Sequence, residues 1–317
     1  MASLVSVFVE AVLPVLAIAA AGYLLGTFRN VAVEPLNTVT LYVLLPALVL
    51  HSLLSSRFGS SVALALVAAM LAFTFLMLLV STAAGRLFGE SGPRLSALVL
   101  AGSFPNTGNF GIPVATFAFG DVGRSVAVIF VVVQNVLIYS LGVAIVTRGE
   151  GRTWRSSLGR IARLPPVYAV LIAALLYAFG RVPPAGGTVV ETLRLLGEAS
   201  IPLFLLILGI QLQEANPGIA LRRTVPGVGL KLLVAPVVGL GVAYALLIDA
   251  PVVARSFVLL CAGPIAVGPL VVFVEYEEGP SGLSGAEYLS TAVFVTTLGS
   301  ILVVTGLIVL LRSGTLL

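Results

Sequence analysis

Apolar residues along this chain form long runs separated by short polar stretches. A helix needs about 20 mostly apolar residues to cross roughly 30 Å of hydrocarbon, and runs of this kind recur through the whole length. We therefore predict an all-α protein with ten membrane-spanning helices and no soluble domain. The predicted spans cover residues 4–26, 33–56, 62–88, 95–119, 124–146, 166–180, 191–212, 224–248, 252–274 and 286–311.

The composition agrees with an integral membrane protein, because 59% of the residues are apolar and 9% are charged, against about 25% charged residues in soluble domains. The chain has no cluster of His, Cys and acidic residues at metal-binding spacing, no phosphate loop and no nucleophile elbow. We therefore expect no enzyme, no cofactor and no metal. The net charge of +4 is better explained by membrane topology than by nucleic acid.

The basic residues predict an orientation. With the amino terminus outside, ten arginines fall in inner loops and six in outer loops and the tail, so the positive-inside rule places both termini outside the cell membrane. The central segment, 148–165, is then cytoplasmic, either as a short helix on the inner leaflet or as an unstructured basic linker. The six outer residues are Arg57, Arg124, Arg181, Arg194, Arg255 and Arg312.

The central segment divides the spans into two sets of five, in residues 1–147 and 166–317. A repeat with an odd number of spans must insert upside down, and inverted repeats are typical of transporters. The sequence supports the duplication weakly but in matching places. The second and seventh spans contain "LLPALVLHSLL" and "SIPLFLLILGI", and the fourth and ninth contain "LVLAGSFPNTGNFGIP" and "FVLLCAGPIAVGP".

The fourth and ninth spans are predicted to be broken helices, because each carries Gly and paired Pro inside an apolar run. Such breaks persist in a membrane only where the freed backbone groups face protein, water or a ligand. Two half-helix amino-terminal ends that meet near the midplane form a site for a carboxylate or similar anion. Asn106, Thr107 and Asn109 add polar side chains there, either to contact the ligand or only to satisfy the break.

Several ionisable residues lie within or near the spans, where a charge costs about 2.5–3.5 kcal/mol at the bilayer centre. Lys231 either snorkels to the inner interface or forms an internal charge. His51 is either an ordinary hydrogen-bonded residue or a pH-responsive one. Glu198 binds a proton or cation, or lies in an outer vestibule, and Glu10 is expected at the outer interface. A solvated inner loop is expected to hold Glu275, Glu277 and Glu278.

The crossover segment "SFPNTGNFGIPVATFAFGD" resembles the auxin efflux carrier family, which contains the plant PIN-FORMED auxin exporters and prokaryotic carriers of malate and malonate. Further stretches resemble the family in the same order along the chain: "LNTVTLYVLLPALVLHSL", "VVVQNVLIYSLG", "LKLLVAP" and "GPIAVGPLVVFVEYEEGPSGLSGAEYLSTAV". The resemblance implies a ten-span fold of the sodium/proton antiporter and bile-acid symporter type. It also implies a homodimer, and a scaffold domain and a crossover transport domain, each drawn from both repeats, that move in an elevator manner.

By this match, Asn106 corresponds to the substrate-contacting crossover Asn of the family, and Gln134 lines the same pocket. Ile265 stands where plant carriers have Gln, which disfavours auxin itself as the substrate. The complete expected substrate-binding set is Pro105, Asn106, Thr107, Asn109, Gln134, Pro264 and Ile265. The residues expected to take part in coupling or to line the pocket are Asn37, His51, Tyr139, Glu198 and Lys231.

The resulting hypothesis is a secondary transporter that exports or exchanges a small organic anion, such as a carboxylate or an auxin-like acid. A sodium-coupled symporter of the bile-acid type, or an anion-binding sensor or channel on the same fold, are the alternatives. A sodium/proton exchanger is disfavoured, because Asp121 and Asp249 lie at span ends and not at the crossover.

Overall fold

The computed structural model describes residues 8–29, 31–55, 59–147, 164–184, 186–214, 221–247, 249–276 and 285–317. Residues 148–163 of the central segment, with Glu277 and Glu278, lie outside these ranges, as does the side chain of Glu275. The described part is helical, as predicted, and contains no strand. Six of its helices are long and apolar enough to cross a membrane, and three shorter apolar helices accompany them.

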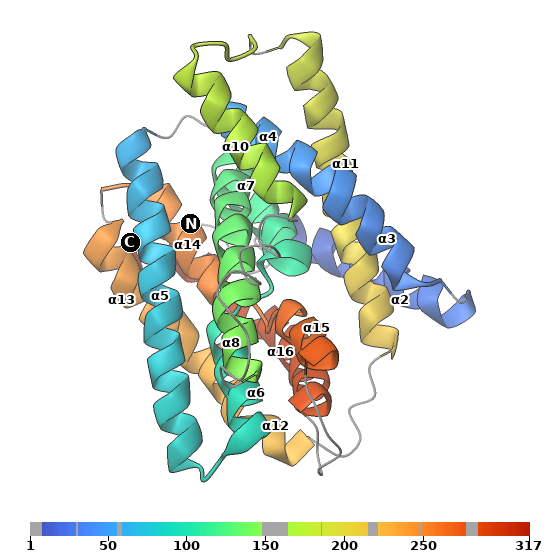
Figure 1. Ribbon diagram of the computed structural model, residues 1–317, viewed down its shortest axis with the longest axis vertical. Coiled ribbons are helices and arrows are strands. Elements are labelled where there is room, and N and C mark those ends of the chain that lie inside the picture. Colours follow the sequence, from blue (N-terminus) through green and yellow to red (C-terminus); the bar gives the residue numbers. More distant parts are fainter. Residues whose placement is uncertain are drawn as a thin grey trace.

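The described helices pack in two groups (Figure 1). The small helix group comprises η1 (Phe8–Val12), α2 (Leu13–Phe28), α3 (Val33–Val39), η2 (Thr40–Leu44), α4 (Leu45–Ser55), α10 (Pro165–Ala178) and α11 (Thr188–Glu214). The large helix group comprises α5 (Ser60–Leu87), α6 (Gly92–Ser103), η3 (Thr107–Gly111), α7 (Ile112–Leu137), η4 (Ile138–Gly142), α8 (Val143–Val146), α12 (Leu221–Gly229), η5 (Leu230–Val234), α13 (Ala235–Leu246), α14 (Pro251–Cys261), α15 (Gly268–Tyr276) and α16 (Gly285–Arg312).

Close backbone contact joins α2 and α11 in the small helix group. A Cβ atom added to Gly209 would lie 2.0 Å from the Ala19 carbonyl oxygen, and one added to Gly22 would lie 2.3 Å from that of Leu206. Small residues at helix interfaces let backbones approach in this way, which compensates for the lack of a hydrophobic driving force in lipid. These two glycines therefore fix how α2 and α11 pack.

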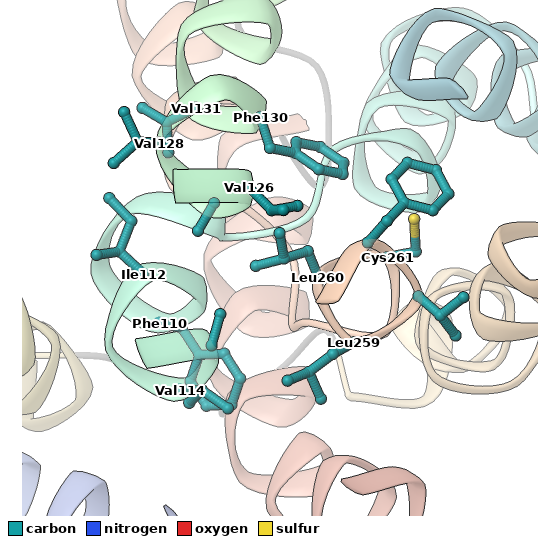
Figure 2. Packing of buried hydrophobic residues seen from close by; sticks show 14 of the residues in the cluster. Phe110, Ile112, Val114, Val126, Val128, Phe130, Val131, Leu259, Leu260 and Cys261 are labelled. Carbon is teal, nitrogen blue, oxygen red and sulfur yellow. The ribbon is translucent and has the colours of Figure 1, made fainter. Parts of the chain in front are cut away.

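The large helix group is built around aromatic and aliphatic packing between α5, α7 and α14. The rings of Phe73, Phe130 and Phe257 lie 5.9–6.4 Å apart between centroids. Figure 2 shows α7 side chains such as Val126 packed beside Leu260, near the end of α14. This core adjoins both predicted breaks, since it includes Phe110 and Cys261.

Large apolar side chains also cover the outside of the molecule. Leu79 on α5, Val237 on α13 and Leu302 on α16 are exposed over 69%, 68% and 80% of their surface. Large apolar side chains exposed on several helices suit contact with lipid.

Candidate functional site

The two predicted helix breaks meet in the structure. Helix α6 ends at Ser103, α14 ends at Cys261, and the residues that follow each helix are extended or bent. Pro105 and Ile265 form an isolated antiparallel bridge. The Asn106 N–H donates to the Pro264 carbonyl oxygen at 2.7 Å, and the Ala266 N–H donates to the Phe104 carbonyl oxygen at 2.9 Å. Each break therefore satisfies backbone groups that the other has freed.

Asn106 caps the helical segment that follows the first break. Its Oδ1 accepts a hydrogen bond from the Asn109 N–H at 3.2 Å, and its carbonyl oxygen accepts one from the Gly111 N–H at 2.9 Å. The residue is only 5% exposed, yet its Nδ2 has no hydrogen-bond partner in the described part of the chain. Leaving a buried donor unpaired costs about 1–3 kcal/mol, so this atom is a strong candidate for a ligand contact.

Other polar groups extend the site from Asn106. The Thr107 hydroxyl donates to Oε1 of Gln134 at 3.0 Å and so holds the side-chain amide of α7 in place. Asn109 Nδ2 lies 3.5 Å from Oε1 of Gln211 on α11, a contact at the limit of a hydrogen bond. The contact between Asn109 and Gln211 joins the two helix groups.

A cavity of about 160 Å³ lies between the small and large helix groups at this place. Its described walls carry side-chain amides and a phenol but no formally charged group. The amino-terminal ends of η3 and α15 border it through the N-cap Asn106 and through Gly268, and such ends carry partial positive charge. The polar side chains of the wall are Asn37, Asn106, Asn109, Gln134, Asn135, Tyr139 and Gln211.

A larger and mainly apolar cavity of about 310 Å³ adjoins the first, since Gln211 and Val267 line both. Its wall comes from α3, α11, α15 and α16 and includes Leu208, Leu270 and Phe294. The two cavities together provide a polar end and an apolar end, an arrangement that suits an organic acid.

Five of the residues expected from the sequence thus share one cavity wall: Asn37, Asn106, Asn109, Gln134 and Tyr139. The remaining members of the expected binding set contact residues of that wall or one another. Thr107 bonds Gln134, Pro264 bonds Asn106, and Pro105 and Ile265 form the bridge between the breaks.

Sequence reasoning missed Asn135 and Gln211, which also line the polar cavity. Asn135 follows Gln134 directly inside an apolar span, and this pair of amides was a readable signal. Gln211 lies at the polar end of the seventh span, where glutamine is common. Only the rotation of the helix, which the sequence does not give, shows that this side chain faces the cavity.

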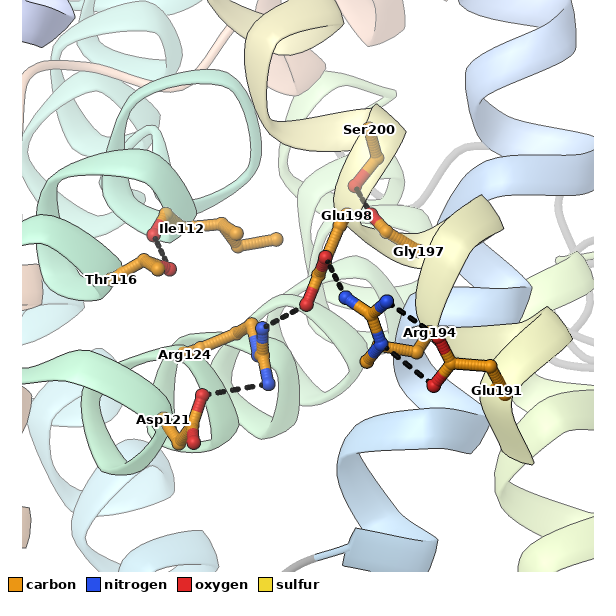
Figure 3. Close-up of polar contacts among 9 residues, drawn as sticks. All are labelled: Ile112, Thr116, Asp121, Arg124, Glu191, Arg194, Gly197, Glu198 and Ser200. Carbon is orange, nitrogen blue, oxygen red and sulfur yellow. Dashed lines mark hydrogen bonds and ion pairs between the residues drawn. The ribbon is translucent and has the colours of Figure 1, made fainter. Parts of the chain in front are cut away.

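A chain of charges joins the helix groups, as Figure 3 shows, and none of its residues lines either cavity. Arg124 on α7 contacts Asp121 at 2.8 Å and Glu198 on α11 at 3.6 Å. Glu198 also pairs with Arg194, which in turn pairs with Glu191. Arg124, which the sequence places at the start of the fifth span, is 8% exposed and lies inside this network. Glu198 does not line either cavity.

His51 and Lys231 are also buried away from both cavities. His51 lies on α4, and its Nδ1 has no hydrogen-bond partner among the described residues. Lys231 is 0% exposed, so of its two expected positions the one that snorkels to the inner interface is wrong. The short distance along the span from Lys231 to the loop favoured a side chain that reaches water. The side chain instead points into the core, where its Nζ donates to the Cys261 carbonyl oxygen at 3.1 Å.

Arg312 stabilises a sharp bend at Gly120, where the backbone has φ 62°. Its Nη2 donates to the Ala118 carbonyl oxygen at 2.7 Å, and its Nη1 lies 3.4 Å from Oε2 of Glu10. Glu10 therefore forms an ion pair at the surface, where its side chain is 65% exposed.

Comparisons with known proteins point to transport. The sequence model of a family described as membrane transport protein matches residues 7–308. An uncharacterized transporter of Methanothermobacter thermautotrophicus is 27% identical over 300 residues, which cover 91% of this chain and 95% of the relative. An uncharacterized transporter of Methanocaldococcus jannaschii is 26% identical over 211 residues, or 64% of this chain and 68% of the relative.

Proposed function

We propose, from the premise that this chain belongs to the membrane transport protein family, the auxin efflux carriers, that it is a secondary transporter of a small organic anion. One observation carries the proposal. Asn106, whose buried Nδ2 donor is unpaired, lies on the wall of a polar cavity between two helix groups, at the amino-terminal end of a half-helix.

The chemistry of the cavity favours a carboxylate as the polar part of the substrate. Asn106 and Asn109 offer amide donors, and the helix ends add a partial positive charge without a fixed cation. A wall of neutral donors binds an anion without holding it as tightly as a buried arginine would, and a carrier must also release its substrate. The adjoining apolar cavity accommodates a hydrocarbon body.

The position of the cavity supports alternating access of the elevator kind, with the large helix group moving against the small one. Residues of both groups line the cavity: Asn37 and Gln211 come from the small group, and Asn106 and Gln134 from the large one. Movement of one group would open the cavity on one side, and it would break the contacts Asn109–Gln211 and Arg124–Glu198. In this proposal the chain forms a ten-span fold of two inverted five-helix repeats, and each repeat contributes one of the crossing broken helices.

The membrane potential alone can drive the export of a monoanion. An inside-negative potential contributes about 2.3 kcal/mol per charge per 100 mV, which corresponds to a gradient of roughly fiftyfold. The proposal therefore includes export without an obligatory coupling ion. It also includes a homodimer in the cell membrane, with both termini outside.

A thermal-shift screen of the purified protein against monocarboxylates, dicarboxylates and indole acids identifies the best ligand. Counterflow in proteoliposomes then tests transport. A carrier accelerates uptake of labelled ligand when unlabelled ligand is present inside, whereas a channel or a sensor does not. Acceleration in choline salts supports the proposal, a strict requirement for sodium would favour a symporter of the bile-acid type, and absence of counterflow would refute transport.

A further inference from the structure

We infer that Lys231 is a built-in cation that holds the end of α14 at the crossing and so positions the backbone partner of Asn106. This assigns the residue a positioning role in the transport site and rests on the proposed function. Within the described part of the chain, Lys231 forms no hydrogen bond with a residue of the cavity wall, so its effect on the site passes through α14.

The surroundings of Lys231 stabilise a positive charge without a carboxylate. Its Nζ donates to the Cys261 carbonyl oxygen at 3.1 Å and lies 5.6 Å from the centroid of the Phe73 ring, within the range of a cation–π interaction. No ion pair joins Lys231 to an acidic residue in the described ranges. A buried lysine without such a partner is costly, so packing alone does not explain why a lysine stands here.

The Cys261 carbonyl is a position where a positive charge is useful. Cys261 is the last residue of α14, and the nearby Val258 and Leu260 carbonyl oxygens accept hydrogen bonds from Ala262 and Gly263 at 3.1 Å. The carboxyl end of a helix carries partial negative charge. In carriers with discontinuous helices, such ends coordinate the coupling Na⁺ or H⁺. Here the ammonium of Lys231 stands at such an end, on the Cys261 carbonyl oxygen.

The end of α14 is linked directly to the site. Three residues after Cys261, the Pro264 carbonyl oxygen accepts the Asn106 N–H at 2.7 Å. The next residue, Ile265, donates its N–H to the Thr296 hydroxyl on α16 at 3.1 Å. Lys231 and Thr296 thus anchor the second break on either side of Pro264. Lys231 itself lies on η5, a π-helical turn of a kind found frequently at functional sites.

Chemical rescue tests the inference without any substrate. K231A removes three methylenes and the ammonium, which together match propylammonium, whereas K231M fills the same space without a charge. We expect both variants to have a lower Tm than the wild-type protein. Propylammonium chloride should raise the Tm of K231A but not that of K231M, and 1-propanol, which has a similar shape without the charge, should have no effect. Equal rescue by 1-propanol, or a wild-type Tm for K231M, would overturn the inference.

Counterflow of the best ligand gives the second readout. K231M is expected to bind that ligand about tenfold more weakly, because it loses the buried hydrogen bond from the ammonium to the Cys261 carbonyl oxygen that positions the ligand site. Propylammonium should restore exchange in K231A, and wild-type exchange should be equal in sodium and choline salts. A sodium requirement in the wild type, or unaltered affinity in K231M, would contradict the role of Lys231. Absence of wild-type exchange with every acid would instead refute the proposed function, while the Tm experiment would still test the lysine.

Discussion

The two breaks that meet at the crossing differ in what they contribute. The first break brings Asn106 and Asn109 to the cavity as polar side chains, whereas the second brings Ala266, Val267 and Gly268. The second break instead supplies backbone: the Pro264 carbonyl oxygen and the Ala266 N–H bond the first break. The two breaks therefore contribute differently: the first places polar side chains on the cavity wall, and the second holds the first in position through its backbone.

The substitution Asn106→Ala should have the largest effect on ligand binding, because it removes both the unpaired donor and the cap of Asn109. A hydrogen bond to a charged acceptor contributes about 1.5–3 kcal/mol, which predicts a loss of roughly tenfold to a hundredfold in the affinity for the best ligand. Calorimetric titration measures it.

The matched control is Ser300→Ala, which changes a buried polar residue of α16 that lines neither cavity. We expect its affinity to equal that of the wild type. Wild-type affinity in Asn106→Ala would show that the polar residues of the first break only satisfy the backbone, and the contrast between the breaks would disappear.

Thr107 and Gln134 test whether the first break acts as a connected unit. Thr107→Val and Gln134→Leu each remove one partner of the hydrogen bond of 3.0 Å. We expect each to weaken ligand binding by about fivefold, and the double variant to fall short of the summed loss by about 0.5–1.5 kcal/mol. A double-mutant cycle on the binding constants measures this coupling, and strict additivity would mean that the two side chains act independently.

Asn109→Ala should have a smaller effect, because its contact with Gln211 is long at 3.5 Å. We expect about a threefold loss of affinity, the size of a weak hydrogen bond, and a faster exchange rate, since the contact joins the helix groups. Counterflow initial rates measure the second effect. The control is Gln213→Ala, which lies on α11 like Gln211 but outside both cavity walls. A slower exchange in Asn109→Ala would argue against a restraining contact.

On the second break, Ile265→Val should have the smallest effect on binding. The Ile265 side chain is fully buried, so losing one methylene should lower the stability by about 0.5–1.5 kcal/mol. Its backbone bridge to Pro105 remains, so we expect the affinity to stay within about twofold, which is less than 0.5 kcal/mol. Thermal unfolding and titration on one sample separate the two quantities. A loss of affinity comparable with that of Asn106→Ala would remove the distinction between the breaks.

The sequence was sufficient to predict the helical class and the meeting of the breaks. Proline and glycine disrupt a helix through local backbone geometry, which is readable from neighbouring residues. Asn106 was recognised from polar residues inside the broken span, whereas Gln134 was identified through the resemblance to the carrier family. Both residues line one cavity in the structure.

The sequence was not sufficient where the direction of a side chain decides the outcome. Lys231 lies two turns into a span, and the same position could lead its ammonium to water or into the core. The ion pair of Glu10 and Arg312 joins residues at opposite ends of the chain. Arg124 likewise finds Glu198 on a distant helix. Such contacts depend on how helices rotate and pack against one another, which the hydrophobic pattern does not specify.

The crossing itself is made by backbone atoms of Phe104, Asn106, Pro264 and Ala266. Any residue other than proline can donate from the two N–H positions, and every residue can accept at the two carbonyls. Evolution can therefore exchange side chains around the cavity to adopt a new substrate without dismantling the joint between the two halves. For the same reason, a protein engineer can randomise Asn109 and Gln211 together while leaving these four residues unchanged, and so select new specificities on an intact frame.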